Sequence, residues 1–183
     1  TARVPLLTIE DLEPDKKEFF DHIAALRVHE ARPFSALLNS PDIAASIARV
    51  GDLLRYTSPT IPEEIREIIT LTTARAFDCQ YLWTHHAGSA EQAGISEEVI
   101  RIIRDEPTPR KLLPKQAVFV QFTRELIERK KLRDSTYSAV DHLLGQAGTV
   151  DLIVTVGYYS MLCIAINALE VELEEDVSPL LPS

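Results

Sequence analysis

The sequence predicts an all-α protein, a bundle of seven or eight helices, and three observations support this fold class. Apolar residues recur three and four residues apart in one segment after another along the chain. Typical helix starts and stops, with Pro, Ser or Asp before a segment and Gly after it, separate these segments. The chain has only six glycines in 183 residues and is 45% hydrophobic, which argues against disorder.

Residues 1–59 are expected to hold the N-terminal helices. Residues 14–28 should form an amphipathic helix, with apolar side chains at helical spacing between charged ones: Phe19, Ile23 and Leu26. A second helix opens at Ser40-Pro41-Asp42, and we expect its buried stripe to consist of Ile43, Ile47, Val50 and Leu54. His22 and His29 lie among charged neighbours and are expected at the surface.

Residues 60–100 are expected to form a pair of consecutive helices. Thr60 and Glu63 match a capping box, which would fix where the first helix begins. This helix has apolar residues on most sides, so it should lie at the centre of the fold. Asp78 is the expected N-cap of the second helix, which should end at Gly94.

Residues 101–183 are expected to supply the remaining helices. A proline-rich connection comes first and is the segment best suited to act as a lid: Pro107, Pro109 and Pro114. The next helix should bury a stripe of Val118, Phe119, Phe122 and Leu126, with Arg124 facing outward. A further helix over residues 134–144 should close at Gly145.

The segment of residues 150–171 is apolar nearly all round and long enough to cross a bilayer. Asp151, Asn167 and Glu170 interrupt it, and no basic anchors flank it. We therefore expect a helix buried in the core or in an oligomer interface, with a membrane span as the weaker alternative. The predicted assembly is a homo-oligomer without a membrane partner.

Length, charge and cysteine content limit the class of protein further. A chain of 183 residues suits one domain, 1–183, with a core of its own. The net charge is −9 and the sequence has no long Lys/Arg cluster, so it does not predict the basic surface that binds nucleic acid. Cys79 and Cys163 lie far apart in the sequence, so a disulfide scaffold is not expected. Without a signal-peptide pattern, we expect reduced thiols and a cytoplasmic protein that acts on a small molecule.

The stretch of residues 67–86 is the part of the chain densest in reactive groups. Cys79, Leu82 and His86 share one face of a helix, since they stand at i, i+3 and i+7. Glu67 lies on the preceding helix, on a stripe that changes from polar to apolar, and should point inward. A carboxyl and an imidazole that meet in a partly dry site form a simple acid–base pair.

The same stretch resembles a known family. Alkylhydroperoxidase D and its carboxymuconolactone decarboxylase-like relatives share a spaced motif: a Glu, a Cys twelve residues later, a second Cys after three more and a His after another four. In this sequence those places hold Glu67, Cys79, Leu82 and His86. Leu82 replaces the cysteine that attacks peroxide in the peroxidase branch. Residues 80–83, Gln-Tyr-Leu-Trp, resemble the Gln-Tyr-Glu-Trp of the non-peroxidase relatives.

The pattern and the resemblance together assign the site residues. The expected catalytic residues are Glu67, His86 and Cys79, and the expected substrate contacts are Tyr81, Trp83 and His85. Each has a structural alternative: a carboxylate paired with an Arg, a core histidine, or core aromatics. His85 and His86 point about 100° apart around a helix, so they are badly placed to grip one metal ion. We expect neither metal nor cofactor.

For function, the leading hypothesis is a cofactor-free acid–base enzyme, such as a decarboxylase, a lyase or a lactone-processing enzyme. Its substrate would be a small oxygenated or carboxylated organic molecule. The first alternative is a thiol-dependent hydroperoxide reductase, which requires a thiolate to attack the peroxide. The second is a non-catalytic oligomeric binding protein, because a fold does not by itself imply an activity.

Overall fold

A computed structural model of the chain describes residues 1–20, 31–57 and 60–182. Within these residues every regular element is helical and no strand occurs, so the all-α prediction is confirmed. The chain divides into two compact units. The N-terminal unit comprises Thr1–Pro59 and Ile164–Glu172, and the motif unit comprises Thr60–Cys163 and Leu173–Ser183. The single domain expected from the chain length stays a prediction.

The N-terminal unit consists of short helices around a small apolar cluster. Its elements in order are η1 (Ile9–Asp11), α1 (Pro14–Lys17), η2 (Glu18–Phe20), α2 (Arg32–Leu37), α3 (Pro41–Asp52) and the π-helical turn η4 (Leu53–Thr57). The cluster combines four large side chains with three small ones: Leu12, Phe20, Phe34, Leu38, Ala44, Ala45 and Ala48. The alanines of α3 let this helix approach its neighbours closely.

Of the expected amphipathic helix over residues 14–28, the structure describes residues 14–20. The α-helical part, α1, ends at Lys17 and continues as the 3₁₀ turn η2. Phe19, predicted to be in the core, is 46% exposed, because the tighter turn directs Phe20 into the cluster instead. The predictions for Ile23, Leu26, His22 and His29 lie outside the described residues.

The predicted buried stripe of α3 was wrong for Ile43, which is 56% exposed, and for Val50, which is exposed as well. Ile47 and Leu54 are partly buried, and Ile47 packs against the cluster. The buried residues of the helix include Ala44, Ala45 and Ala48. The sequence pattern was ambiguous, since the large apolar residues and the alanines both recur at helical spacing. Close packing against the cluster of the N-terminal unit selected the face with the smaller side chains.

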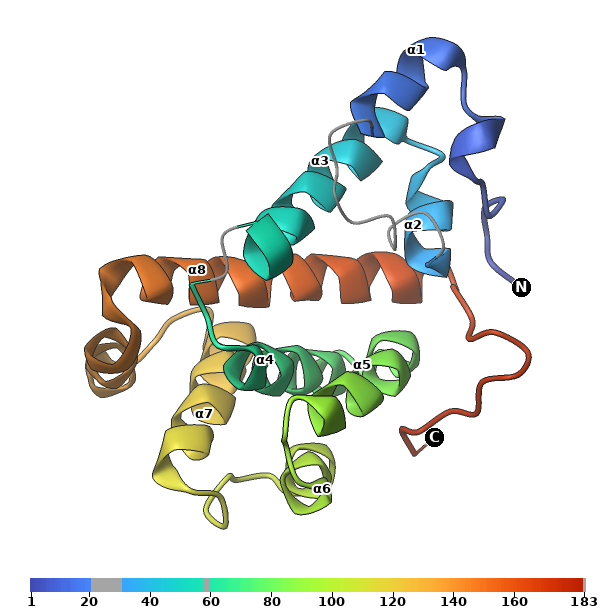
Figure 1. Cartoon of the computed structure of the whole chain (residues 1–183). Coiled ribbons are helices and arrows are strands. Elements are labelled where there is room, and N and C mark those ends of the chain that lie inside the picture. Colours follow the sequence, from blue (N-terminus) through green and yellow to red (C-terminus); the bar gives the residue numbers. More distant parts are fainter. Residues whose placement is uncertain (21–30, 58–59, 183) are drawn as a thin grey trace. The chain divides into compact units, whose positions relative to one another are not determined.

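The motif unit is organised around α4, as its apolar sequence predicted. Its helices are α4 (Glu63–Ala76), α5 (Gln80–Gln92), α6 (Glu97–Asp105), α7 (Pro114–Arg129) and the greater part of α8 (Asp134–Ala168). Ten of the 14 residues of α4 are buried. The helix packs against α5, α6 and α7, and Figure 1 shows it between α5 and α7. A side chain at the middle of α4 therefore lies in the interior of this unit.

The predicted capping box at the start of α4 was wrong. The helix begins at Glu63 with Pro62 as its N-cap, so Glu63 occupies the first helical position instead of the third, from which it could close a box. Glu63 lies 3.8 Å from Arg66 instead. The Thr60 hydroxyl donates a hydrogen bond to the carboxylate of Asp151 on α8.

The junction between α4 and α5 places Cys79 rigidly. Asp78 is not the N-cap that the sequence suggested but the left-handed residue that ends α4, with φ 47°. Its N–H donates to Arg75 O at 3.1 Å, and the N–H of Cys79 donates to Ala74 O at 2.8 Å. These two bonds form a Schellman motif. Cys79 is thus the third residue after the end of α4 at Ala76 and also the N-cap of α5.

A substitution at Asp78 tests this turn. We expect Asp78→Val to lower the free energy of unfolding by about 1–2 kcal/mol, because a β-branched side chain is strained in the left-handed region. Asp78→Gly should stay within about 0.5 kcal/mol of the parent, since glycine adopts this conformation without strain while the exposed ion pair with Arg75 is lost. Urea unfolding measures both. Equal stability of the two variants would contradict the assignment.

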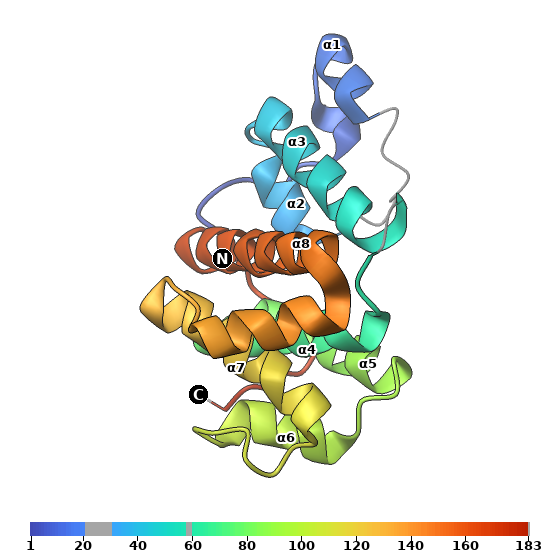
Figure 2. The same ribbon diagram turned by 90° about the vertical axis from the view of Figure 1, so that its left-hand side faces the viewer.

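Helix α8 consists of two limbs, as expected from Gly145. This residue has φ 70° and ψ 175°, and Figure 2 shows the sharp change of direction between the limbs. In the second limb, Leu152, Val156, Tyr159 and Cys163 are buried on one side. The opposite side exposes an apolar stripe of Val150, Ile153, Val154 and Met161. By length and composition alone α8 could cross a membrane, and half of its most apolar stretch is buried within the protein.

In α7, Phe119 and Phe122 lie in the core as predicted, whereas the prediction that Arg124 faces outward was wrong. Phe119 and Phe122 are fully buried. Arg124 is only partly exposed, and its guanidinium donates to the carbonyl oxygens of Ile103, Glu106 and Pro107 at 3.1–3.2 Å. This arginine therefore ties down the start of the proline-rich connection that was expected to act as a lid.

Candidate active site

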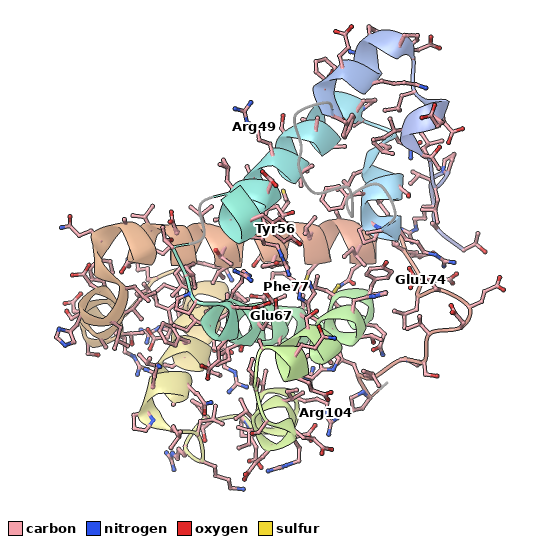
Figure 3. All side chains as sticks on the ribbon, viewed as in Figure 1. Arg49, Tyr56, Glu67, Phe77, Arg104 and Glu174 are labelled. Atoms are coloured by element: carbon pink, nitrogen blue, oxygen red, sulfur yellow. The ribbon has the colours of Figure 1, made fainter. Side chains whose placement is uncertain are left out.

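Glu67 and His86 form a direct contact between α4 and α5. Glu67 Oε2 lies 2.7 Å from His86 Nδ1. The Glu67 side chain is 0% exposed and that of His86 is 13% exposed. Figure 3 shows Glu67 on α4 within the packed side chains of the motif unit. The structure therefore directs the carboxylate inward, as the stripe on α4 predicted, and brings together the two residues expected to be catalytic.

The contact orients the imidazole. When Glu67 is ionised its carboxylate only accepts hydrogen bonds, and His86 Nδ1 is then the donor, which leaves Nε2 as the other ring nitrogen. Tyr159, on the buried side of α8, packs edge-on against this ring with centroids 5.5 Å apart. A buried carboxylate next to an oriented imidazole also stabilises the imidazolium, which favours proton transfer by His86.

Cys79, the third expected catalytic residue, lies in the interior of the protein. Cys79 and Cys163 are both fully buried. The hydrogen bond from Cys163 lowers the pKa of Cys79; burial raises it, the backbone N–H of Leu82 lowers it, and the net shift is downward. The pKa of Cys163 is raised by this hydrogen bond, by burial and by the charge on Cys79.

The three expected substrate contacts lie in two different surroundings. The Tyr81 hydroxyl donates to Glu174 Oε1 at 2.8 Å, and His85 Nε2 lies 2.8 Å from Glu174 Oε2. The two rings face each other with centroids 4.4 Å apart. Trp83 is one of the largest fully buried side chains. The substrate-binding role of all three stays a prediction, and Trp83 also has the burial of a core residue.

The comparisons with known proteins agree with the motif. Residues 41–125 match the profile of the carboxymuconolactone decarboxylase family, and this range includes Glu67, Cys79 and His86. The chain is carboxymuconolactone decarboxylase-like. The resemblance first drawn from these three residues is thereby confirmed. No curated protein matches the sequence at a significant level.

A solved structure shares the fold of this carboxymuconolactone decarboxylase-like chain. It is the alkylhydroperoxidase AhpD core, a peroxidase-related protein from Ralstonia eutropha JMP134. The TM-score is 0.75, and the alignment covers 96% of this chain and 93% of that one at 15% identity. This similarity shows the all-α fold, so any conclusion about chemistry has to come from the side chains.

Three residues of the site region were not predicted from the sequence: Tyr159, Cys163 and Glu174. Tyr159 and Cys163 share a helix face, four residues apart, which is visible in the sequence. The contact of Tyr159 with His86 on α5 depends on how α8 packs and is not visible there. Glu174 belongs to an irregular segment beyond α8, where no periodicity guides a prediction. Among the described residues, no group of three or more His, Cys, Asp or Glu side chains could hold a metal ion.

The segment after α8 lies along α5 and is held by side chains of that helix. Gln80 accepts hydrogen bonds from the N–H groups of Leu180 at 3.1 Å and Leu181 at 2.8 Å, and it donates to Leu181 O at 2.8 Å. Thr84 Oγ1 accepts from Leu180 N at 3.2 Å. Together with the contacts of Glu174, these bonds attach the segment to α5.

The attachment through Glu174 should depend on pH. Burial raises the pKa of Glu174, but hydrogen bonds from its own backbone N–H, from Tyr81 and from His85 outweigh burial and hold the pKa below its ordinary value. A carboxylate whose pKa is lowered by folding stabilises the folded state above its unfolded pKa, about 4.3. That contribution is lost as the pH falls through the folded pKa.

We therefore expect the segment to stay attached at neutral pH and to loosen only in acid. The amide NMR shifts of Leu180 and Leu181 should change in a step below pH of about 4. In Glu174→Gln the same shifts should lack that step. Glu175→Gln, at an exposed neighbouring position, is the matched control and should keep it. A step that persists in Glu174→Gln would assign the transition to another group.

Proposed function

We propose that this carboxymuconolactone decarboxylase-like protein is a cofactor-free acid–base enzyme. Its reaction would be that of a decarboxylase, a lyase or a lactone-processing enzyme on a small oxygenated or carboxylated organic molecule. The observation that carries the proposal is the 2.7 Å contact between Glu67 Oε2 and His86 Nδ1 in a nearly dry part of the motif unit. A structural ion pair would satisfy the same geometry, so the chemistry needs a direct test.

In this mechanism His86 exchanges a proton with the substrate through Nε2. Loss of carbon dioxide, or of a proton next to a carbonyl, leaves an enolate that must be protonated or stabilised. The imidazolium of His86 can donate that proton, and Glu67 stabilises the imidazolium because its carboxylate is fixed against Nδ1. Tyr159 restricts the rotation of the imidazole, because the two rings pack nearly at right angles to each other. Burial strengthens each of these interactions.

The test is a turnover assay on a panel of small lactones and carboxylated carbonyl compounds. The assay measures the release of protons or of carbon dioxide. We expect His86→Gln to abolish most of the turnover. His142→Gln is the matched control, because His142 is an exposed histidine on α8. Turnover that requires a thiol reductant and a hydroperoxide would instead support the thiol peroxidase alternative. Binding of panel members without any turnover would support the non-catalytic alternative.

We also propose that the protein is a homo-oligomer, on the basis of the apolar stripe on α8. Val150, Ile153, Val154 and Met161 are each at least 37% exposed along one side of the helix. A contiguous apolar surface of this kind is typical of an interface. A second copy of the chain is the expected partner. The expected absence of nucleic-acid and membrane partners, and the cytoplasmic location, stay predictions.

Sedimentation at micromolar concentration should therefore show a dimer or a larger species. Val154→Glu places a charge in the stripe and should shift the equilibrium toward the monomer, because the charge would have to be buried in the interface. Ser138→Glu, at an exposed position on the first limb of α8, is the matched control and should not shift it. A strictly monomeric parent protein would contradict the proposal.

A further inference from the structure

Two donors on α5 bind the two oxygens of one carboxylate, that of Glu174. The Tyr81 hydroxyl donates to Oε1 at 2.8 Å, and His85 Nε2 lies 2.8 Å from Oε2. Each oxygen thus has its own partner, which is the arrangement that recognises a carboxylate at two points. Figure 3 shows Glu174 on the segment that follows α8. We call these two side chains of α5 the Tyr81–His85 pair.

The geometry of the Tyr81–His85 pair is set mainly by α5 itself. The two residues are four positions apart, so their side chains lie next to each other on one face of the helix. Their rings are 4.4 Å apart between centroids, with a tilt of 36°. Tyr81 is 7% exposed, so packing holds its ring, while the His85 side chain is 38% exposed. The pair is therefore a prearranged set of donors that can be reached from solvent.

The segment that supplies the carboxylate has few buried residues. Hydrogen bonds join it to α5 at Glu174 and at the backbone of Leu180 and Leu181. Between these two places, four of the five residues 175–179 are exposed and the other is only partly buried. A segment of this kind can open locally at a small cost in free energy, without unfolding the helices.

We propose that the Tyr81–His85 pair is a binding site for a small organic carboxylate, and that such a ligand displaces Glu174 and loosens the segment of residues 174–181 from α5. The pair recognises the carboxylate group itself, through the two contacts of 2.8 Å that Glu174 makes here. His86 is turned about 100° from His85 around α5. The site is therefore separate from the proposed acid–base site, and the inference does not depend on that activity.

The pair favours a charged ligand over a neutral one of the same shape. Burial raises the pKa of Glu174, but hydrogen bonds from its own backbone N–H, from Tyr81 and from His85 outweigh burial and lower the pKa. Donors that lower the pKa of a carboxyl group stabilise its ionised form. We therefore expect the pair to bind acetate and not acetamide.

Glu174 and the ligand compete for the same two donors. The ligand can bind only in the fraction of molecules from which the Glu174 carboxylate has left the pair, so its apparent Kd is raised by that fraction. If Glu174 occupies the pair in about nine molecules of ten, its removal should lower the apparent Kd about 10-fold. An anion that binds elsewhere on the surface would bind with and without Glu174 alike.

The experiment titrates the full chain with sodium acetate at pH of about 7, where carboxylates are ionised, and at constant ionic strength. NMR signals of the Tyr81 and His85 rings report binding. Acetate is the probe because Glu174→Ala removes a CH₂–COO⁻ group with the same heavy atoms. We expect the midpoint of the titration to be at least about 10-fold lower in Glu174→Ala than in the parent. Glu175→Ala, at an exposed neighbouring position, is the matched control and should keep the parent midpoint.

The parent protein reports the displacement of its own segment. Acetate should move the amide signals of Leu180 and Leu181 toward their positions in Glu174→Ala, because the ligand takes the place of the side chain. Acetamide has the shape of acetate without the charge, and sodium chloride supplies an anion without the shape, so neither should have this effect.

Two further variants identify the donors. Tyr81→Phe and His85→Ala, each combined with Glu174→Ala, should weaken acetate binding by about 10-fold, since each removes one hydrogen bond to a charged group. The proposal is overturned if Glu174→Ala does not bind acetate or binds it with the parent midpoint, or if loss of either donor leaves binding unchanged. It is also overturned if chloride or acetamide acts as well as acetate, or if acetate binds the parent without moving the signals of Leu180 and Leu181.

Discussion

Glu67→Gln and His86→Gln are each expected to lower the turnover of the true substrate by about 10²- to 10⁴-fold, the usual loss when a general acid or base is removed. Glutamine keeps roughly the volume and hydrogen-bonding capacity of both side chains but cannot exchange a proton at neutral pH. The loss would therefore report on proton transfer and not on packing. Steady-state kinetics on the substrate found in the panel assay measures it, with Glu98→Gln and His142→Gln as exposed controls.

The double variant gives the more stringent result. If Glu67 and His86 act as one unit, the second substitution should cost little beyond the first, because groups that share one catalytic function are non-additive. Stability has to be followed in parallel, since breaking a buried pair can cost roughly 3–5 kcal/mol by leaving the other group without compensation. Folded Gln variants that turn over the substrate at the parent rate would leave the pair as a structural contact.

The helices of the motif unit could be predicted because their signals are local. The apolar circumference of α4 indicated its central position, and Gly94 and Gly145 marked helix ends that the structure contains, with φ of 88° and 70°. The inward direction of Glu67 followed from its place on a stripe that changes from polar to apolar. All of these depend on residues within one or two turns of each other.

The predictions that failed depended on partners distant in the sequence. The pattern of α3 contained two candidate faces, and packing against Phe34 and Leu38 decided for the alanines. Arg124 looked like a surface charge because the carbonyl groups that it binds belong to another helix end. A pattern of polar and apolar residues carries no information about which helix will pack against which.

The same limitation concealed the contact between Tyr159 and His86. Both residues were visible in the sequence, but they lie far apart along the chain. The buried side of α8 brings Tyr159 to His86. A helix distant in the sequence therefore completes the surroundings of the proposed acid–base site.

Trp83→Ala is expected to lower the free energy of unfolding by about 3–5 kcal/mol, which is typical of removing a large aromatic side chain from a packed core. Trp83 is 1% exposed and lies on α5 between Cys79 and His86 in the sequence. The reason for the loss is the cavity that a small residue would leave among its neighbours. Urea unfolding measures the effect, and Tyr137→Ala, at an aromatic residue that is 43% exposed, is the control.

The kinetics of Trp83→Phe distinguish the core role from the predicted substrate contact. Phenylalanine fills most of the space, so the variant should fold, and its loss of stability should be smaller than that of the alanine variant. A residue that acts only in the core should leave KM unchanged in this folded variant, while a substrate contact should raise it. If Trp83→Ala instead stayed within about 0.5 kcal/mol of the parent and raised KM strongly, the side chain would line the binding site and the packing argument would be wrong.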